Sequence, residues 1–286
     1  MRLLIALALL LLAVPASARP ALWKLADHDT TIWLFGTIHV LPENTRWRDP
    51  ELDRAIAASR ALVLETVLDR DPGEVGRQLL TLGRAEGLPP LAERVPVAQR
   101  ARLAAMVARS GMPAHTLDQL KSWAAAFVLT GVAMREIGER HPLGPGVEPQ
   151  LSEGFRAAGK PVEGLETVAE QLGYFDAMPE AAQRVFLAAT LDDVATAGAD
   201  FRHLVTAWES GDTAAIERAF ADDPEFTPET RDLLIRRRDE AWAAALARRL
   251  EQPGTIFVAV GAGHLVGRDS VQKMLAAKGL TVERVR

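Results

Sequence analysis

Two histidines in this chain follow the same local pattern, an apolar run that ends in Gly-x-x-His. The first run is TIWLFGTIH, which ends at His39, and the second is TIFVAVGAGH, which ends at His264. A run of β-forming residues that stops at a glycine predicts a buried strand with the histidine at its carboxyl end. Open α/β sheets bind their ligands at such strand ends. Two imidazoles placed in the same way therefore predict one shared site.

Two further apolar runs end in glutamate: ALVLE ends at Glu65, and KPVEGLE ends at Glu166. If the four strands are parallel neighbours, their carboxyl ends converge on one edge of the sheet. Two imidazoles with one or two carboxylates suit zinc, manganese, cobalt or iron. A metal site of this kind supports hydrolysis, and a remaining glutamate can act as general base. Gly36 and Gly261 are expected to allow tight turns and a close approach of the backbone to a ligand.

Each of these residues also has a structural interpretation, because a histidine after a strand can satisfy local backbone groups and a strand-end glutamate can simply meet water. The repetition of the pattern favours a shared site. The remaining histidines lack the pattern and are expected to be structural or on the surface: His28, His115, His141 and His203. The sequence contains no Gly-x-Ser-x-Gly, no Walker loop, no His-Glu-x-x-His and no cysteine, which argues against the usual serine, thiol and helix-borne zinc enzymes.

The elements that must position these residues alternate between strand and helix. Strands are expected at 21–24, 31–35, 61–65, 160–166, 255–260 and 280–285, and helices at 50–59, 97–110, 116–139, 148–158 and 268–278. This alternation predicts an α/β fold, with a mainly parallel or mixed sheet flanked by helices. Long helical insertions are expected at about 72–140 and 168–250. There is no tandem repeat of fixed period.

The composition is apolar enough for a substantial core, and its net negative charge does not favour nucleic-acid binding. The chain has 286 residues, is 48% hydrophobic and carries a formal net charge of −5. Its basic residues are spread along the expected helices, so neither nucleic-acid binding nor a strongly basic membrane-binding face is predicted. Because cysteine is absent, stability must come from the core, with a bound metal as a candidate further source.

Residues 1–18 have the features of a signal peptide. Arg2 supplies the positive charge, residues 3–14 are apolar, and Ala16-Ser17-Ala18 matches a cleavage site. The apolar run is shorter than the roughly 20 residues that span a bilayer. We expect cleavage after Ala18 and transport across the inner membrane to the periplasm, with an uncleaved anchor as the alternative. The mature domain is then 19–286, and no stable membrane insertion is expected.

Over nearly all of that mature chain, the ordered motifs resemble the TraB/GumN family, whose relatives include the Tiki metalloproteases. The resemblance lies in residues 33–41, in 146–167, in 238–242 and in 260–267. It implies an α/β core of the TraB/Tiki/EreA–ChaN type with paired Gly-x-x-His motifs at the active site. In the Tiki branch it implies metal-dependent peptide cleavage, with manganese or cobalt favoured and zinc as a further candidate.

Carried over by position, the resemblance implies that His39, His264 and Glu65 are metal ligands. It implies that Glu65, Glu166 and Arg238 are catalytic, with Arg238 holding a carboxylate or stabilising an oxyanion.

The chain departs from the family pattern at three places. It has Glu148 where relatives often have Asp, Asp239 where they often have Asn, and Ser122-Trp123 where they often have Pro-Trp. The glutamate keeps the charge of the aspartate that it replaces. The aspartate at 239 adds an anion beside Arg238, and the two are expected to pair with each other.

The leading functional hypothesis is an exported, metal-dependent hydrolase that acts on peptides. One alternative is a non-catalytic periplasmic protein of the same fold that sequesters a peptide or small ligand. Another is an esterase-like or haem-handling relative. Nothing in the sequence distinguishes a peptide bond from an ester bond or sets the oligomeric state.

Overall fold

The computed structural model describes residues 18–68, 72–192, 194–221 and 227–286. The expected signal peptide, 1–18, therefore lies outside the described residues except for its last position. Among the residues that are described, no helix is both long and apolar enough to cross a membrane.

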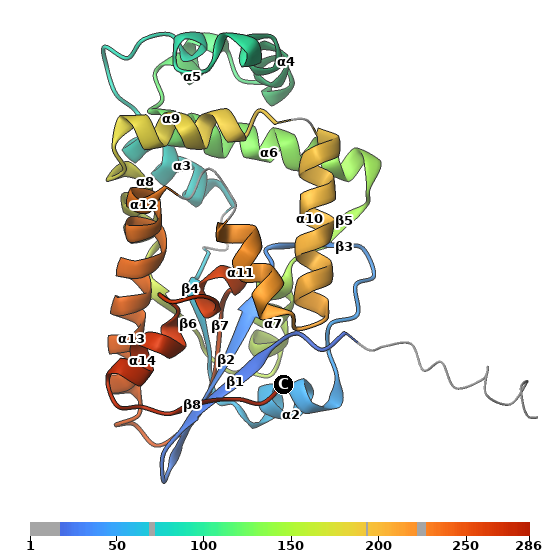
Figure 1. Ribbon diagram of the computed structural model, residues 1–286, viewed down its shortest axis with the longest axis vertical. Helices are drawn as coiled ribbons and strands as arrows, with labels where there is room; N and C mark the ends of the chain where they lie inside the picture. Colours follow the sequence, from blue (N-terminus) through green and yellow to red (C-terminus); the bar gives the residue numbers. More distant parts are fainter. Residues whose placement is uncertain (1–17, 69–71, 193, 222–226) are drawn as a thin grey trace, which may run out of the picture.

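Six strands form one sheet in the order β6-β4-β7-β2-β1-β8 (Figure 1). β2, β7, β4 and β6 run parallel to one another, whereas β1 is antiparallel to both β2 and β8. The strands are β1 (Leu22–Ala26), β2 (Thr30–Thr37), β4 (Leu62–Thr66), β6 (Val162–Glu166), β7 (Gly254–Gly261) and β8 (Val282–Arg284). The expected α/β fold with a mainly parallel or mixed sheet is confirmed. The four apolar runs that lead to His39, Glu65, Glu166 and His264 form four consecutive parallel strands of this sheet.

The central strands are apolar on both faces because helices cover the sheet on both sides. Along β7, Phe257 and Ala259 pack into one core, whereas Ile256, Val258 and Val260 pack into the other. This two-sided burial explains why the sequence of β7 is a continuous apolar run.

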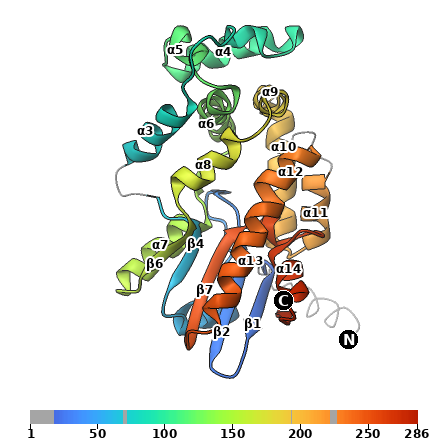
Figure 2. The ribbon, with the colours of Figure 1, turned by 90° about the vertical axis from the view of Figure 1, so that its left-hand side faces the viewer.

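The helices on one face are α2 (Pro50–Ala58), α7 (Val147–Ala157), α10 (Val194–Glu209) and α11 (Thr213–Ala221). Those on the other are α13 (Arg237–Arg249) and α14 (Val271–Ala277), which Figure 2 shows alongside β7. The α2 helix starts where the sequence indicates, because Pro50 is its first residue and the Asp49 carboxylate accepts hydrogen bonds from two backbone N–H groups of its first turn. The result is a three-layer α/β/α body.

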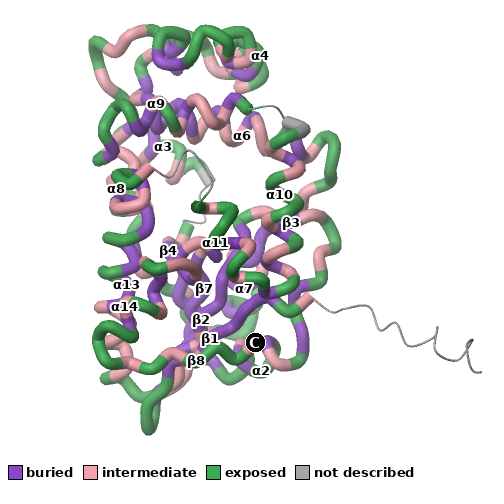
Figure 3. Tube along the Cα trace, in the orientation of Figure 1, coloured by how far each residue is buried: buried purple, intermediate pink, exposed green. Residues whose placement is uncertain are grey.

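The remaining helices form a second body beyond the carboxyl ends of the parallel strands, with its own buried centre (Figure 3). They are α3 (Pro72–Gly83), α4 (Arg100–Ser110), α5 (Ala114–Asp118), α6 (Ser122–Arg140), α8 (Val168–Asp176) and α9 (Glu180–Ala189). Their shared core contains Trp123 of α6 together with Leu172 of α8 and Leu187 of α9. Residues from both long helical stretches therefore pack into one core.

Short elements complete the described chain: β3 (Val40–Pro42), β5 (Leu143–Pro145), η1 (Leu91–Glu93), η2 (Val97–Gln99), α12 (Pro228–Arg231), η3 (Asp232–Arg236) and η4 (Ala262–Leu265). β3 and β5 pair as a separate two-stranded sheet. The η3 segment is a single turn of π-helix that leads directly into α13, where the Arg237 N–H reaches the Asp232 carbonyl five residues back.

Two expected helices differ from those observed. The expected helix at 116–139 is broken between α5 and α6, because Leu120 forms a β-bridge with Arg84 and the Lys121 N–H donates to the Gly83 carbonyl. Ser122 then becomes the first residue of α6, a position that also accepts the proline common in relatives. The expected helix at 268–278 begins later, at Val271.

Candidate functional site

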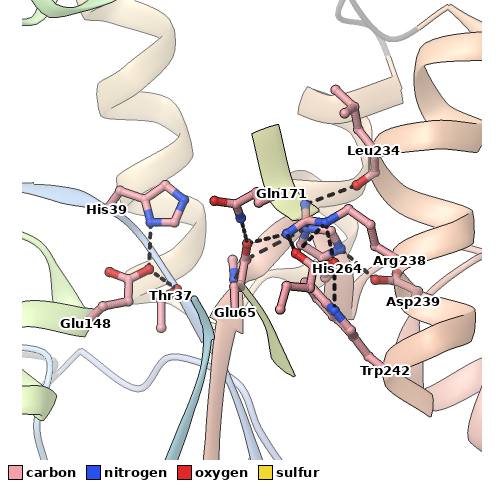
Figure 4. Close-up of polar contacts among 12 residues, drawn as sticks. Thr37, His39, Glu65, Glu148, Gln171, Leu234, Arg238, Asp239, Trp242 and His264 are labelled. Carbon is pink, nitrogen blue, oxygen red and sulfur yellow. Dashed lines mark hydrogen bonds and ion pairs between the residues drawn. The ribbon is translucent and has the colours of Figure 1, made fainter. Parts of the chain in front are cut away.

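The ends of three neighbouring strands bring together Glu65, Glu166 and His264, which share Arg238 as a partner. Figure 4 shows Glu65, His264 and Arg238 at this place. Glu65 lies near the end of β4 and Glu166 ends β6, whereas His264 lies in η4, immediately after β7. All three residues are buried, with 9% of their surface exposed or less. The expected convergence of strand-end groups is therefore present for these three residues.

Arg238 lies at the centre of this cluster. Its Nε donates to both oxygens of Glu166 (3.0 and 3.1 Å), and its Nη2 donates to Glu166 Oε2 (2.9 Å) and Glu65 Oε2 (2.7 Å). Its Nη1 lies 3.1 Å from His264 Nε2 and donates to the Leu234 carbonyl (3.2 Å) in the π-helical turn. Every guanidinium nitrogen thus has a protein partner. Of the two roles expected for Arg238, holding a carboxylate is the one that this geometry favours.

Glu65 is held as an ionised carboxylate. Its Oε1 accepts a hydrogen bond from the Gly261 N–H at 2.6 Å. Burial raises the pKa of this carboxyl, but the charges of His264 and Arg238 outweigh burial and bring the pKa down to about 2. His39 adds a smaller effect in the same direction.

His264 is oriented by Asp239. The ring Nδ1 lies 2.6 Å from Asp239 Oδ1, and the ring packs on Trp242 with centroids 4.5 Å apart. Its Nε2 faces the cluster, 3.8 Å from Glu65 Oε1. Burial raises the pKa of Asp239 to about 6, although the nearby His264 opposes this shift.

The expected pairing of Asp239 with Arg238 is wrong. Consecutive residues of a helix do not face each other. In the first turn of α13, the guanidinium of Arg238 therefore turns to the two glutamates, whereas the carboxylate of Asp239 turns to His264. The Asp239 carboxylate, which stands where relatives often have Asn, therefore contacts Nδ1 of His264.

His39 is held in the same way from the other side of the sheet edge. Its Nδ1 lies 2.6 Å from Oε1 of Glu148, in the first turn of α7, and that oxygen also accepts from the Thr37 hydroxyl at 2.6 Å. The hydrogen bond to Glu148 raises the pKa of His39 to about 9, although desolvation opposes it. The His39 side chain is 73% exposed, so it faces solvent.

The three expected metal ligands are not equally close. His264 Nε2 and Glu65 Oε1 are separated by 3.8 Å, whereas His39 stands apart in Figure 4. Within the described part of the chain, the three do not bring their ligand atoms within 4.8 Å of one another. The one such triad found there is Asp27, His28 and Asp29 on an exposed turn.

The two glycines act by close packing and not by a turn conformation. Gly36 lies inside β2 and Gly261 ends β7, and neither has a positive φ. A Cβ at Gly261 would lie 3.0 Å from Glu65 Oε1, and one at Gly36 would lie 3.1 Å from the Ala262 Cα. Both glycines thus pack closely against protein groups, the expected close approach to a ligand stays a prediction, and the expected tight turns are not present.

Sequence reasoning missed several members of the site. Gln171 of α8 donates from Nε2 to Glu65 Oε2 at 3.0 Å, and Trp242 donates from Nε1 to Glu166 Oε1 at 2.9 Å. No local pattern marks either side chain. One signal for the position of Gln171 was present, since Thr167 and Glu170 form a capping box that starts α8 directly after Glu166.

This fold and site define an α/β protein with two carboxylate-backed histidines and a buried arginine–glutamate cluster at the carboxyl edge of its sheet. The model of the TraB/PrgY/gumN family matches residues 21–284. The chain therefore belongs to the TraB/PrgY/gumN family, as its motifs suggested. No curated protein and no solved structure matches it.

Proposed function

We propose that this protein is an exported, metal-dependent hydrolase that cleaves peptides. The observation that supports hydrolysis most directly is the pair formed by His264 and Glu65. A carboxylate-oriented imidazole and an ionised glutamate lie 3.8 Å apart in a buried cluster at the end of parallel strands. Peptides as the substrate class, and the metal requirement, follow from the likeness to the Tiki branch. Export rests on the signal-peptide pattern.

The donor set suits a divalent cation in part. Two ligand atoms about 2.1 Å from one ion lie at most about 4.2 Å apart, so the spacing of His264 Nε2 and Glu65 Oε1 is suitable for sharing an ion. The carboxylate of Asp239 behind His264 is the usual support for a metal-bound imidazole. Arg238 competes, because its Nη1 faces the same Nε2 lone pair.

His264 and Glu65 would hold the cation, and His39 is the further predicted ligand from across the sheet edge. A cation held there would polarise the scissile carbonyl group as a Lewis acid.

The protein's own groups have separate tasks in the proposed reaction. Asp239 keeps the Nδ1 proton of His264 in place, which leaves Nε2 to face the site. Arg238 and the Gly261 N–H hold Glu65 ionised and fixed. Glu148 holds Nδ1 of His39, and a cation bound at Nε2 would replace the second proton, which a pKa of about 9 keeps on the free imidazole at neutral pH.

Metal analysis of the purified mature chain, residues 19–286, tests the proposal. We expect about one equivalent of manganese or cobalt per chain after loading, lost in both His264→Ala and His39→Ala. His141→Ala is the control, since His141 contacts Arg202 and lies outside the site. Full metal occupancy in the double variant His39→Ala/His264→Ala would refute the metal assignment.

Cleavage is then measured on a pool of N-acetylated hexapeptides with each candidate metal. Loss of all cleavage in Glu65→Gln, with metal analysis repeated on that variant, is the expected result. Tight peptide binding without turnover in the wild-type protein would favour the sequestering alternative, and a Soret band on haem titration would favour the haem-handling one.

A further inference from the structure

Gln171 lies between Glu65 and His39 at the carboxyl edge of the sheet (Figure 4). It is one turn into α8, and the Thr167–Glu170 capping box fixes the start of that helix directly after Glu166. Its Nε2 donates to Glu65 Oε2 at 3.0 Å. In Figure 4 its side chain reaches the space between Glu65 and His39. The position of this amide is therefore set both by its helix and by the glutamate.

The orientation of the Gln171 amide is determined by its partner. Glu65 already accepts from Arg238 Nη2 at 2.7 Å and from the Gly261 N–H at 2.6 Å, so its carboxylate acts as an acceptor throughout. An amide oxygen facing it would place two acceptors in contact. The NH₂ group must therefore face Glu65, and the flipped amide is excluded on hydrogen-bonding grounds. Oε1 consequently points away from Glu65, toward the His39 side (Figure 4).

The Gln171 carbonyl oxygen is an acceptor without a partner. No described residue donates to it, and it is not among the buried side-chain atoms that lack a partner, so it is not fully enclosed by protein. Around it, Arg238 is fully engaged and His39 reaches toward Glu148 through Nδ1. A fixed and accessible acceptor in this place is suited to a group that arrives with the substrate.

We propose that Gln171 is a specificity-determining residue that accepts a hydrogen bond from the N–H of the scissile amide. This inference rests on the proposed hydrolytic function and names its substrate class as amides in preference to esters. In an ester, an oxygen without hydrogen replaces the N–H, so two acceptors would face each other at Gln171. A site built to accept a substrate N–H discriminates strongly against the analogue that lacks it.

A purely positioning role for Gln171 would have a different signature. If its one task were to hold Glu65, losing it would slow amide and ester hydrolysis by the same factor. Esters are also intrinsically easier to cleave, so absolute rates decide nothing. The informative quantity is the ratio of kcat/KM for a peptide to kcat/KM for its depsipeptide, compared between wild type and variant.

The probes are one hexapeptide cleaved in the pool described above and its depsipeptide, in which oxygen replaces the scissile N–H. Gln171→Met removes both the donor and the acceptor at similar length, whereas Gln171→Lys keeps a donor for Glu65 and removes the acceptor. We expect the peptide-to-depsipeptide ratio to fall about tenfold or more in both variants, as the loss of one substrate hydrogen bond predicts. Gln252→Met is the matched control, because Gln252 is exposed in the loop before β7, at the opposite end of that strand from His264.

An unchanged ratio in both Gln171 variants would overturn the proposal, even if both rates fall. Cleavage of neither probe by the wild-type protein would count against the proposed hydrolysis and not against Gln171. In that case the same peptide and depsipeptide pools are compared as ligands by calorimetry. We then expect the wild type to bind the peptide pool more tightly and Gln171→Met to lose that preference, and equal binding of both pools by the wild type would refute the inference.

Discussion

His39 and His264 are held by the same arrangement in two different surroundings. Each Nδ1 lies 2.6 Å from a carboxylate in the first turn of a helix, Glu148 for His39 and Asp239 for His264. Asp239 is fully buried, and burial raises its pKa. Burial raises the pKa of Glu148, but the hydrogen bond to His39, the charge of His39 and the hydrogen bond from Thr37 together lower it below its ordinary value. The site therefore pairs an ionised glutamate behind one imidazole with an aspartate that resists ionisation behind the other.

The first prediction concerns the proton on His39. With a pKa of about 9, His39 should remain an imidazolium well above neutral pH. Glu148→Gln removes the charge that holds this proton, so the pKa of His39 should fall toward its ordinary value of 6.5. The ring carbon proton signals in an NMR titration report this pKa directly. Glu153→Gln, an exposed change on the same helix, should leave it unchanged. A pKa near 6.5 for His39 in the wild type would refute the effect of Glu148 on this histidine.

The second prediction concerns the buried ion cluster. Glu166 accepts from Arg238 and from the Trp242 indole, so Glu166→Gln leaves a buried guanidinium without one of its two counter-charges. Removing one partner of a buried pair typically costs about 3–5 kcal/mol. We expect a loss of about 3 kcal/mol in the free energy of unfolding, measured by urea denaturation. Glu163→Gln, on an exposed position of the same strand, should change it by less than about 0.5 kcal/mol.

At the scale of elements, the junction between α7 and the residues after β2 determines where His39 stands. The Val147 N–H donates to the Ile38 carbonyl at 3.1 Å. A Cβ on Gly146, the residue before α7, would lie 2.1 Å from the His39 carbonyl oxygen. The helix that supplies Glu148 can therefore dock on the backbone of His39 because position 146 has no side chain.

This contact gives the third prediction. Gly146→Ala should destabilise the protein by about 2 kcal/mol, as overpacking does, and should separate His39 from Glu148. Gly154→Ala, inside the same helix with nothing within 4 Å of the added Cβ, should instead stabilise by about 0.5–1 kcal/mol. Thermal unfolding gives both effects, and the NMR titration of His39 reports the separation. Equal effects of the two alanines would show that the junction is not tight.

The elements themselves were largely predictable from local pattern. The run that ends at Glu65 is a short, continuously apolar segment, and the run that ends at Glu166 follows Gly159 and Pro161. These local features were enough to predict both strands. The break at Leu120 was not predictable, because the residues around it continue the helical pattern of α6. It exists because Leu120 pairs with Arg84, a contact between two distant segments.

At the scale of the whole molecule, parallel strand order is what converts separate motifs into a site. That order let the sequence indicate that Glu65, Glu166 and His264 converge. Arg238 entered through family resemblance alone, since no local rule shows that a helical arginine reaches two strand ends. Two further contacts, Asp239 with His264 and Gln171 with Glu65, depend on how α13 and α8 pack against the edge of the sheet. The local sequence pattern does not predict that packing.

The last prediction concerns how the stability of the whole protein depends on pH. Glu65 has a pKa of about 2 in the fold against an ordinary 4.5, so its contribution is present above pH 4.5 and is lost as pH falls toward 2. Asp239 behaves oppositely, with a pKa of about 6 against 3.8. Its contribution is complete below pH 3.8 and is lost as pH rises through 6.

Urea unfolding between pH 3 and pH 8 separates the two contributions. Glu65→Gln should be least stable relative to the wild type above pH 5, with the deficit shrinking in acid. Asp239→Asn, which restores the amide common in relatives, should gain relative to the wild type as pH rises from 4 to 7, because the wild type alone must ionise a fully buried carboxyl group. Parallel curves for Asp239→Asn and the wild type would mean that burial does not raise the pKa of Asp239.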